Sequence, residues 1–232
     1  MSEIVEDLQQ VKHNIAAAAK RAGRDSDEVK LVAVTKTRGL EEINEVVDEG
    51  IINLGENRVQ EMQDKYGEVS SRVNWHMIGH LQRNKVKYIM RMDRCNLIHS
   101  VDSLRLAKEI NKRAGKNGRV MNILVQINVA GDDNKFGLKL EETIEYLEKV
   151  SSFENIKVKG LMTMVPYVED TEEVRPYFRK LKKLFDRAKE EEIPNIEMKE
   201  LSMGITNDYE VAIEEGATIV RIGSAIFGPR QY

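Results

Sequence analysis

Near its N-terminus the chain reads Leu31-Val32-Ala33-Val34-Thr35-Lys36, a β-branched apolar run that closes on a lysine. Seven further apolar runs follow along the chain, at 51–54, 75–78, 97–100, 122–129, 158–163, 200–203 and 218–222. Charged segments with the spacing of amphipathic helices separate these runs. Continuous apolar strands alternating with helices are typical of parallel strands buried on both faces and joined by right-handed crossovers. The sequence therefore predicts an α/β fold with about eight parallel strands.

Such a strand count fits a closed (β/α)8 barrel of the TIM type, and 232 residues suit one domain of this kind. A doubly wound open sheet is the competing architecture, but no Gly-x-Gly-x-x-Gly follows any of the runs. Only residues 225–232 follow the last run, whereas an extra helix precedes the first. We predict a single barrel domain over 1–232, with residues of about 3 to 22 packed against the outer face of the last strand.

The composition argues against several classes of partner. Lys+Arg 36 against Asp+Glu 39 give a formal charge of −3, so no basic field exists to hold nucleic acid or an anionic membrane. Cys95 is the sole cysteine, and no His, Cys or carboxylate pair has metal-binding spacing. The N-terminus is acidic where a signal peptide would be basic. We expect a soluble cytoplasmic protein, monomeric, with no metal, nucleic acid or membrane among its partners.

Lys36 is expected to leave the first strand at its carboxyl end, where barrel proteins place their sites. A lysine whose stem lies along apolar walls has a partly desolvated amine, which can attack an aldehyde and form an imine. The alternative is that Lys36 simply leaves the strand end and enters water.

A candidate anion site follows the seventh run, in the segment Ser202-Met203-Gly204-Ile205-Thr206-Asn207. Its hydroxyls, a glycine that allows close backbone approach and the N–H groups of a following helix would suit a phosphate. Asp208 favours a second interpretation, in which it satisfies the helix end and Thr206 or Asn207 are ordinary caps.

The eighth run contains Arg221 and is followed by Gly223 and Ser224. A buried arginine needs a partner, which a ligand or a nearby carboxylate would supply. Because barrel closure makes the first and eighth strands neighbours, this arrangement predicts a ligand with both an aldehyde and a phosphate. Pyridoxal 5′-phosphate fits, with an imine on Lys36, phosphate held by the loops 202–206 and 223–224, and Arg221 at the pyridine nitrogen.

Seven short motifs span almost the whole chain: Val34-Thr35-Lys36, Leu54-Gly55-Glu56-Asn57, Trp75-His76-Met77-Ile78-Gly79, Leu81-Gln82-Arg83-Asn84-Lys85, Gly160-Leu161-Met162-Thr163-Met164, Leu201-Ser202-Met203-Gly204 and Arg221-Ile222-Gly223-Ser224-Ala225-Ile226-Phe227-Gly228. Together they resemble the pyridoxal phosphate homeostasis protein family, whose fold is similar to the N-terminal barrel of alanine racemase. The resemblance implies an internal aldimine on Lys36 and a position at the pyridine nitrogen for Arg221. It also implies a phosphate site that includes Ser202, Gly223 and Ser224.

Three more residues are implied around the cofactor by the resemblance alone: Asn57, His80 and Met203. The chain departs from the family at two points. Relatives commonly read Met-Ser where this chain has Ile205-Thr206, and many carry another residue at the position of His80. Because Thr206 keeps a hydroxyl, phosphate contact is still expected there.

The function implied is a carrier that holds pyridoxal phosphate and buffers it or delivers it to client enzymes. An arginine at the pyridine nitrogen makes the ring a poor electron sink, which disfavours carbanion chemistry, and no catalytic residue is assigned. The alternatives are a small single-domain racemase or lyase and a phosphate-binding barrel without pyridoxal.

Other polar groups receive a mainly structural interpretation. His76 is expected to pack, although a general acid or base is conceivable, and His99 and His13 are isolated in the sequence. The basic stretch 83–94 could meet RNA or an acidic partner but is better explained as a solvated helix face. Lys135 could approach the site as a second amine or be simply exposed. Asp170 or Thr171 can cap a long charged helix that ends before Pro194.

Overall fold

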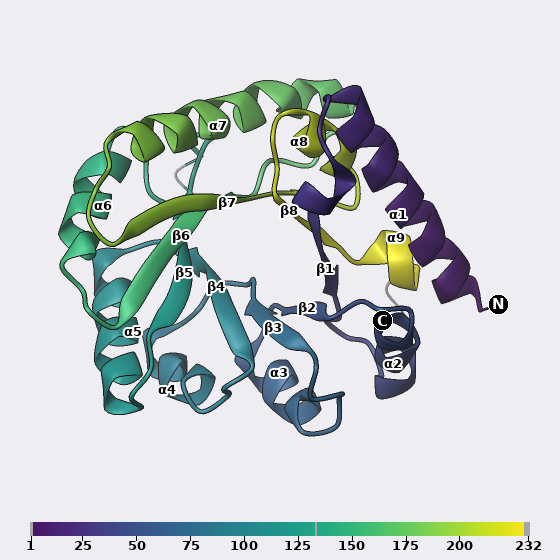
Figure 1. Ribbon diagram of the computed structural model, residues 1–232, viewed down its shortest axis with the longest axis horizontal. Coiled ribbons are helices and arrows are strands. Elements are labelled where there is room, and N and C mark those ends of the chain that lie inside the picture. Colours follow the sequence, from purple (N-terminus) through teal and green to yellow (C-terminus); the bar gives the residue numbers. More distant parts are fainter. Residues whose placement is uncertain (1, 133, 230–232) are drawn as a thin grey trace.

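The computed structural model describes residues 2–132 and 134–229. Met1, Asp133 and residues 230–232, which the predicted domain 1–232 includes, lie outside the described residues. Within the described ranges the strands form a closed parallel barrel in chain order (Figure 1). They are β1 (Lys30–Val34), β2 (Asn53–Glu56), β3 (Asn74–Met77), β4 (Cys95–Val101), β5 (Met121–Ile127), β6 (Ile156–Thr163), β7 (Ile196–Ile205) and β8 (Ile219–Ile222). The predicted α/β barrel is confirmed.

Closure of the barrel rests on parallel pairing between its first and last strands. Val32 pairs with Arg221 and Ala33 pairs with Ile222, while on the other side of β1 Val34 pairs with Gly55. Because the pairing is parallel, the carboxyl ends of β1 and β8 leave the barrel side by side. Lys36 therefore emerges next to the loop that begins at Gly223.

Helices connect the strands and cover the barrel from outside (Figure 1). Those after β1 to β4 are α2 (Leu40–Asp48), α3 (Val59–Tyr66), α4 (Val86–Ile89) and α5 (Leu104–Lys116). Those after β5 to β8 are α6 (Thr143–Ser151), α7 (Arg175–Glu190), α8 (Tyr209–Glu214) and α9 (Ser224–Phe227). Short 3-10 turns lie at η1 (Ser26–Glu28), η2 (Arg83–Lys85) and η3 (Thr171–Val174).

The extra N-terminal helix α1 (Glu3–Arg21) is present and occupies a place in the outer ring (Figure 1). It buries one apolar face, made by Leu8, Val11, Ile15, Ala18 and Ala19. Its main contacts are with α8, α9 and α2, the helices that follow β7, β8 and β1. The expected contact with the last strand itself is thus largely replaced by helix–helix packing.

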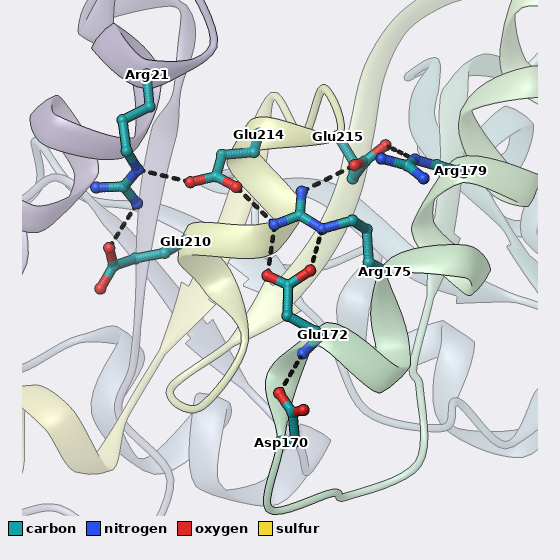
Figure 2. A network of polar contacts seen from close by, with 8 residues as sticks. All are labelled: Arg21, Asp170, Glu172, Arg175, Arg179, Glu210, Glu214 and Glu215. Atoms are coloured by element: carbon teal, nitrogen blue, oxygen red, sulfur yellow. Dashed lines mark hydrogen bonds and ion pairs between the residues drawn. The ribbon is translucent and has the colours of Figure 1, made fainter.

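A network of ion pairs ties α8 to α1 and α7 (Figure 2). The guanidinium of Arg175 lies 2.7 Å from Glu214 and 2.9 Å from Glu215, and it also binds Glu172. On the other side of α8, Arg21 lies 2.6 Å from Glu214. We call these contacts the α8 ion-pair network. Because α8 follows the candidate anion segment after β7, the network holds in place the helix that supports this segment.

Candidate functional site

A cavity of about 550 Å³ opens at the carboxyl ends of the strands. Seven predicted site residues line it: Lys36, Asn57, His80, Thr206, Arg221, Gly223 and Ser224. They come from the ends of β1, β2, β3, β7 and β8, so the fold gathers residues that are up to 188 positions apart, from Lys36 to Ser224. The volume lies within the range of small-molecule and cofactor sites.

The backbone at Lys36 is held by its neighbours. Thr37 adopts a φ of 62°, in the left-handed region that a β-branched residue rarely enters. Its N–H donates to Glu61 Oε2 at 3.0 Å, and its hydroxyl donates to the carbonyl of Lys36 at 2.6 Å. The left-handed turn directly after β1 thus redirects the chain at the point where Lys36 reaches the cavity.

A buried polar cluster lies beneath this turn. Glu56 is fully buried and accepts hydrogen bonds from Thr35 Oγ1 at 2.6 Å and from Lys65 Nζ at 2.7 Å. Lys65 also donates to the carbonyl of Thr35 at 2.7 Å. Burial raises the pKa of Glu56, and the hydrogen bonds from Lys65 and Thr35 oppose that rise. The cluster fixes the end of β1 against α3.

Arg221 points from β8 into the cavity wall and is only 3% exposed. Its Nη2 donates to the carbonyl of Thr163 at 2.9 Å and to Met164 Sδ at 3.0 Å, and its Nη1 donates to Ser202 Oγ. Among the described residues no carboxylate forms an ion pair with it. Burial lowers the pKa of Arg221 to about 10, and the more distant Asp208 opposes this. Hydrogen bonds to Ser202, Thr163 and Met164 thus take the place of the expected carboxylate in this structure, and a ligand for Arg221 stays a prediction.

Thr206, Gly223 and Ser224 form the wall beside Lys36. The N–H of Gly223 donates to Thr206 Oγ1 at 3.3 Å, which joins the loops after β7 and β8. A Cβ at Gly223 would lie 3.3 Å from Val34 Cβ, so the absence of a side chain lets this loop approach β1 closely. Thr206 and Ser224 therefore line the same cavity as Lys36.

Ser202, Met203 and Gly204 do not line the cavity but lie behind its wall. Ser202 and Met203 are fully buried, the first against Arg221 and the second in the apolar core. Gly204 has a φ of 90°, and a Cβ there would lie 2.9 Å from Tyr209 Cα. Its lack of a side chain allows close packing against α8, and a part for its backbone in ligand binding stays a prediction.

Asp208 also differs from its expected role. Its side chain makes no capping hydrogen bond to α8 but accepts one from the N–H of Ile205 at 2.6 Å. Burial raises the pKa of this carboxyl group, and the hydrogen bond from Ile205 opposes the rise. Asp208 thus closes the loop after β7 and leaves the wall beside Thr206 in place.

Asn57, His80 and several residues that the sequence did not single out also line the cavity. A Cβ at position 79 would collide with the backbone of Asn57, so Gly79 lets these two backbone segments lie close together. His80 stacks on Phe136 with ring centroids 3.8 Å apart and places Nδ1 3.3 Å from Asp102 Oδ2. Lys135 lines the cavity and is also exposed, so the structure agrees with both of its expected positions.

Ile205 and Asn207, from the predicted anion segment, line the cavity too, whereas the sequence did not assign these further lining residues to the site: Arg38, Ile78, Gln126, Asn134, Phe136, Met162, Met164 and Tyr167. Three of them form an exposed apolar rim, with 56% exposure for Phe136, 43% for Met164 and 78% for Tyr167. These three residues lie in loops directly after β5 and β6. That position could have identified them from the sequence, since loops at this end of a barrel surround its site.

His99 is not isolated in space, which corrects the inference from its sequence position. It is fully buried, with Nδ1 2.9 Å from Ser202 Oγ and Nε2 2.9 Å from His76 Nδ1. His76 in turn lies 3.3 Å from Asn53 Oδ1. Nothing in the spacing of these residues along the chain indicates this contact, because it depends on three strands meeting inside the barrel.

The described residues contain no helix able to span a membrane. Within the same ranges no cluster of three or more His, Cys, Asp or Glu side chains is arranged to hold a metal ion.

Comparison with known proteins places this fold and site in a class. A family model for the alanine racemase N-terminal domain matches residues 7–231. The chain therefore belongs to the alanine racemase N-terminal domain family and, by the relatives described next, to its pyridoxal phosphate homeostasis proteins.

One such relative, from Aquifex aeolicus (strain VF5), is 47% identical over 228 residues that cover 98% of each chain. Another, from Escherichia coli (strain K12), is 38% identical and covers 100% of this chain and 99% of its own. A solved structure of PipY from Synechococcus elongatus PCC7942 with PLP bound has a TM-score of 0.81 and 30% identity, covering 92% of this chain and 100% of its own.

Proposed function

We propose that this protein binds pyridoxal 5′-phosphate in the cavity, holds it as an imine on Lys36, and buffers or delivers it inside the cell without efficient catalysis. The observation that carries the proposal is the buried guanidinium of Arg221, which faces a cavity shared with Lys36 and has no carboxylate partner among the described residues. A buried charge of this kind is costly unless a ligand meets it. The relatives named pyridoxal phosphate homeostasis protein and the PLP-bound PipY support the choice of ligand.

The residues present fit the aldehyde and the phosphate of this cofactor. An amine suits the aldehyde, and Lys36 supplies one at the cavity wall. The hydroxyls of Thr206 and Ser224, beside the close approach at Gly223, suit the phosphate. Asn57 and His80 would contact the ring, and Ser202, Met203 and Gly204 would support the wall from behind.

Arg221 favours a carrier over an enzyme. When bound, the cofactor supplies an electron sink whose strength depends on protonation of its ring nitrogen. A guanidinium donates hydrogen bonds and keeps its own protons, so it stabilises the unprotonated nitrogen and weakens that sink. We therefore propose no catalytic residue in this chain, and a monomer whose cavity stays open to client enzymes.

Absorption spectra recorded with and without borohydride test the proposal, followed by peptide mapping of the reduced adduct. Imine absorbance at the edge of the visible region and an adduct on Lys36 are expected, and both should vanish in Lys36→Ala. The matched control is Lys116→Ala, because Lys116 is exposed at the end of α5, away from the cavity lining. An adduct mapped to Lys135, which shares the cavity wall, would refute the assignment to Lys36.

Incubation of the loaded protein with separate L- and D-amino acids tests the absence of efficient catalysis. We expect no sustained change in optical rotation and no product beyond the amount of protein present. Repeated turnover would instead establish a racemase or lyase of the single-domain type. Transfer of the cofactor to an apoenzyme, followed by recovery of that enzyme's activity, tests delivery.

A further inference from the structure

A chain of buried hydrogen bonds crosses the barrel interior from the cavity toward its amino end. Arg221 Nη1 donates to Ser202 Oγ, which lies 2.9 Å from His99 Nδ1. His99 Nε2 lies 2.9 Å from His76 Nδ1, and His76 Nε2 lies 3.3 Å from Asn53 Oδ1. Ser202 and His99 are fully buried and His76 is 3% exposed, so the middle of the chain is shielded from water.

One direction of these hydrogen bonds gives every donor along the chain an acceptor. A guanidinium can only donate, so Ser202 Oγ accepts from Arg221 and must place its own proton elsewhere. Among the described contacts the acceptor offered to that proton is His99 Nδ1. His99 then carries its proton on Nε2 and donates to His76 Nδ1. By the same logic His76 carries its proton on Nε2 and donates to Asn53 Oδ1.

Both histidines are suited to remain neutral. No carboxylate pairs with either ring among the described residues; the groups whose charge opposes protonation are Lys30 for His76, and His76, Arg221 and Lys30 for His99. Burial lowers the pKa of His76 to about 3 and lowers that of His99 well below its ordinary value. A neutral imidazole donates at one nitrogen and accepts at the other, which is what an unbroken one-way chain requires.

We propose that His99 and His76, each as a neutral Nε2–H tautomer, are positioning residues that orient Arg221 through the hydroxyl of Ser202. This inference rests on the proposed function, since its consequence is for a ligand in the cavity. With the Ser202 proton held by His99, a lone pair of Oγ faces the guanidinium, and Thr163 and Met164 fix its Nη2. The Nε–H and one Nη1–H of Arg221 have no acceptor among the described residues, so they are available to a ring nitrogen with a free lone pair.

Long-range 1H–15N spectra of the protein without cofactor test the tautomers between pH 5.5 and 8.5. Two imidazoles should show protonated Nε2 and bare Nδ1, unchanged across this range, and spectra of His99→Asn and His76→Gln assign them. A proton on Nδ1 of either ring, or a change of charge in the range, would overturn the proposal. Because no cofactor is present, this result stands whether or not the proposed function holds.

Cofactor affinity, measured by absorption titration, tests the positioning role. In His99→Asn the side-chain oxygen can accept the Ser202 proton in place of Nδ1, whereas His99→Leu offers no acceptor. For His99→Asn we expect a cofactor affinity within about threefold of that of the unmodified protein. For His99→Leu we expect an affinity roughly tenfold weaker, because one buried hydrogen bond is lost. Equal affinities for the two variants, with both shown to be folded by their melting curves, would refute the role. If His99→Leu fails to fold, the spectra of the unmodified protein still decide. Failure of the unmodified protein to bind pyridoxal phosphate would instead reject the proposed function.

Discussion

At the scale of single residues, Arg221 combines burial with the lack of a carboxylate partner among the described residues. Replacing this buried charge by an apolar side chain removes its desolvation penalty, which offsets the loss of its hydrogen bonds to Ser202 and Thr163. We therefore expect Arg221→Met to leave the free energy of unfolding without cofactor unchanged or about 1 kcal/mol higher. Cofactor affinity should fall at least about tenfold, since a charge-assisted hydrogen bond is lost. Urea unfolding and absorption titration measure the two effects.

The matched control for this substitution is Arg119→Met. Arg119 also donates to backbone carbonyls, at 3.1 Å to Met92 and 2.8 Å to Cys95, but it lies away from the cavity. The Arg119→Met substitution should lower the free energy of unfolding and leave cofactor affinity unchanged. A loss of more than about 3 kcal/mol in Arg221→Met would show that the guanidinium is a structural group and contradict its assignment to a ligand.

A second prediction at this scale concerns Cys95, which is fully buried at the start of β4. Burial raises the pKa of its thiol to about 12, so the thiolate that reacts with disulfide reagents is absent from the folded protein at pH 8. We expect no labelling in buffer and one thiol labelled in denaturant. Rapid labelling of the folded protein would contradict the burial.

The same thiol predicts a dependence of stability on pH. In the folded protein the Cys95 thiol keeps its proton up to about pH 12, whereas in the unfolded chain it ionises near pH 9. The folded state therefore binds more protons between about pH 9 and 12. Stability should therefore fall as pH rises through this window, by up to about 1.4 kcal/mol per pH unit from this group. Cys95→Ala removes this contribution, and its unfolding free energy should decline less steeply above pH 9.

At the scale of elements, the α8 ion-pair network joins α8, which follows the loop after β7, to α1 and α7 (Figure 2). Arg175 is half-buried and holds Glu172, Glu214 and Glu215, and hydrogen bonds to these carboxylates raise its pKa. Arg175→Gln should cost about 1 to 2 kcal/mol, more than a typical exposed pair, because three carboxylates are left facing each other. Amide exchange in α8 and at residues 205–208 should accelerate.

Arg179→Gln provides the comparison within the same network. Arg179 is 60% exposed and pairs with Glu215 alone, at 2.9 Å, so its loss should cost less than about 0.5 kcal/mol. Salt should reduce both effects. Equal costs for the two substitutions would mean that the network acts as ordinary surface charge and does not fix α8.

The sequence predicts helices and strands well where burial imposes a clear pattern of apolar residues. It predicts poorly the contacts between residues that lie far apart in the chain. The runs at 31–35 and 218–222 closely match β1 and β8, because strands buried on both faces stay apolar throughout. The long charged helix after Asp170 divides in two: Asp170 caps η3, and α7 begins anew with Pro176 in its first turn, where a missing N–H costs nothing.

The lack of a sequence signal for distant contacts also explains why only some of the site residues could be predicted. Lys36, Arg221 and Gly223 could be placed because strand ends in a closed barrel must meet at one edge. Whether Ser202 faces the cavity or its wall depends on a single strand position, and the sequence does not specify which face of β7 turns inward where both are apolar. The contact of His99 with Ser202 joins residues 103 positions apart and has no local signal.

At the scale of the whole molecule, the outer ring depends on a helix that precedes the barrel in the chain. α1 buries Leu8, Val11 and Ile15 against α8, α9 and α2, and so joins the last part of the barrel to the first. Truncation of Leu8 to Ala should cost about 2 to 5 kcal/mol, as is usual for a fully buried leucine. Gln10→Ala, at an exposed position of the same helix, should cost less than about 0.5 kcal/mol.

Deletion of residues 1–22 extends this test to the ring as a whole. The faces of α8 and α9 that pack against α1 would meet water, so we expect aggregation or a large fall in melting temperature. The loops after β7 and β8 directly precede those two helices and supply Thr206, Gly223 and Ser224 to the cavity. Any deletion variant that stays folded should therefore bind the cofactor more weakly than the complete chain. A soluble variant with an unchanged melting temperature and unchanged affinity would show that the barrel closes and forms its site without α1.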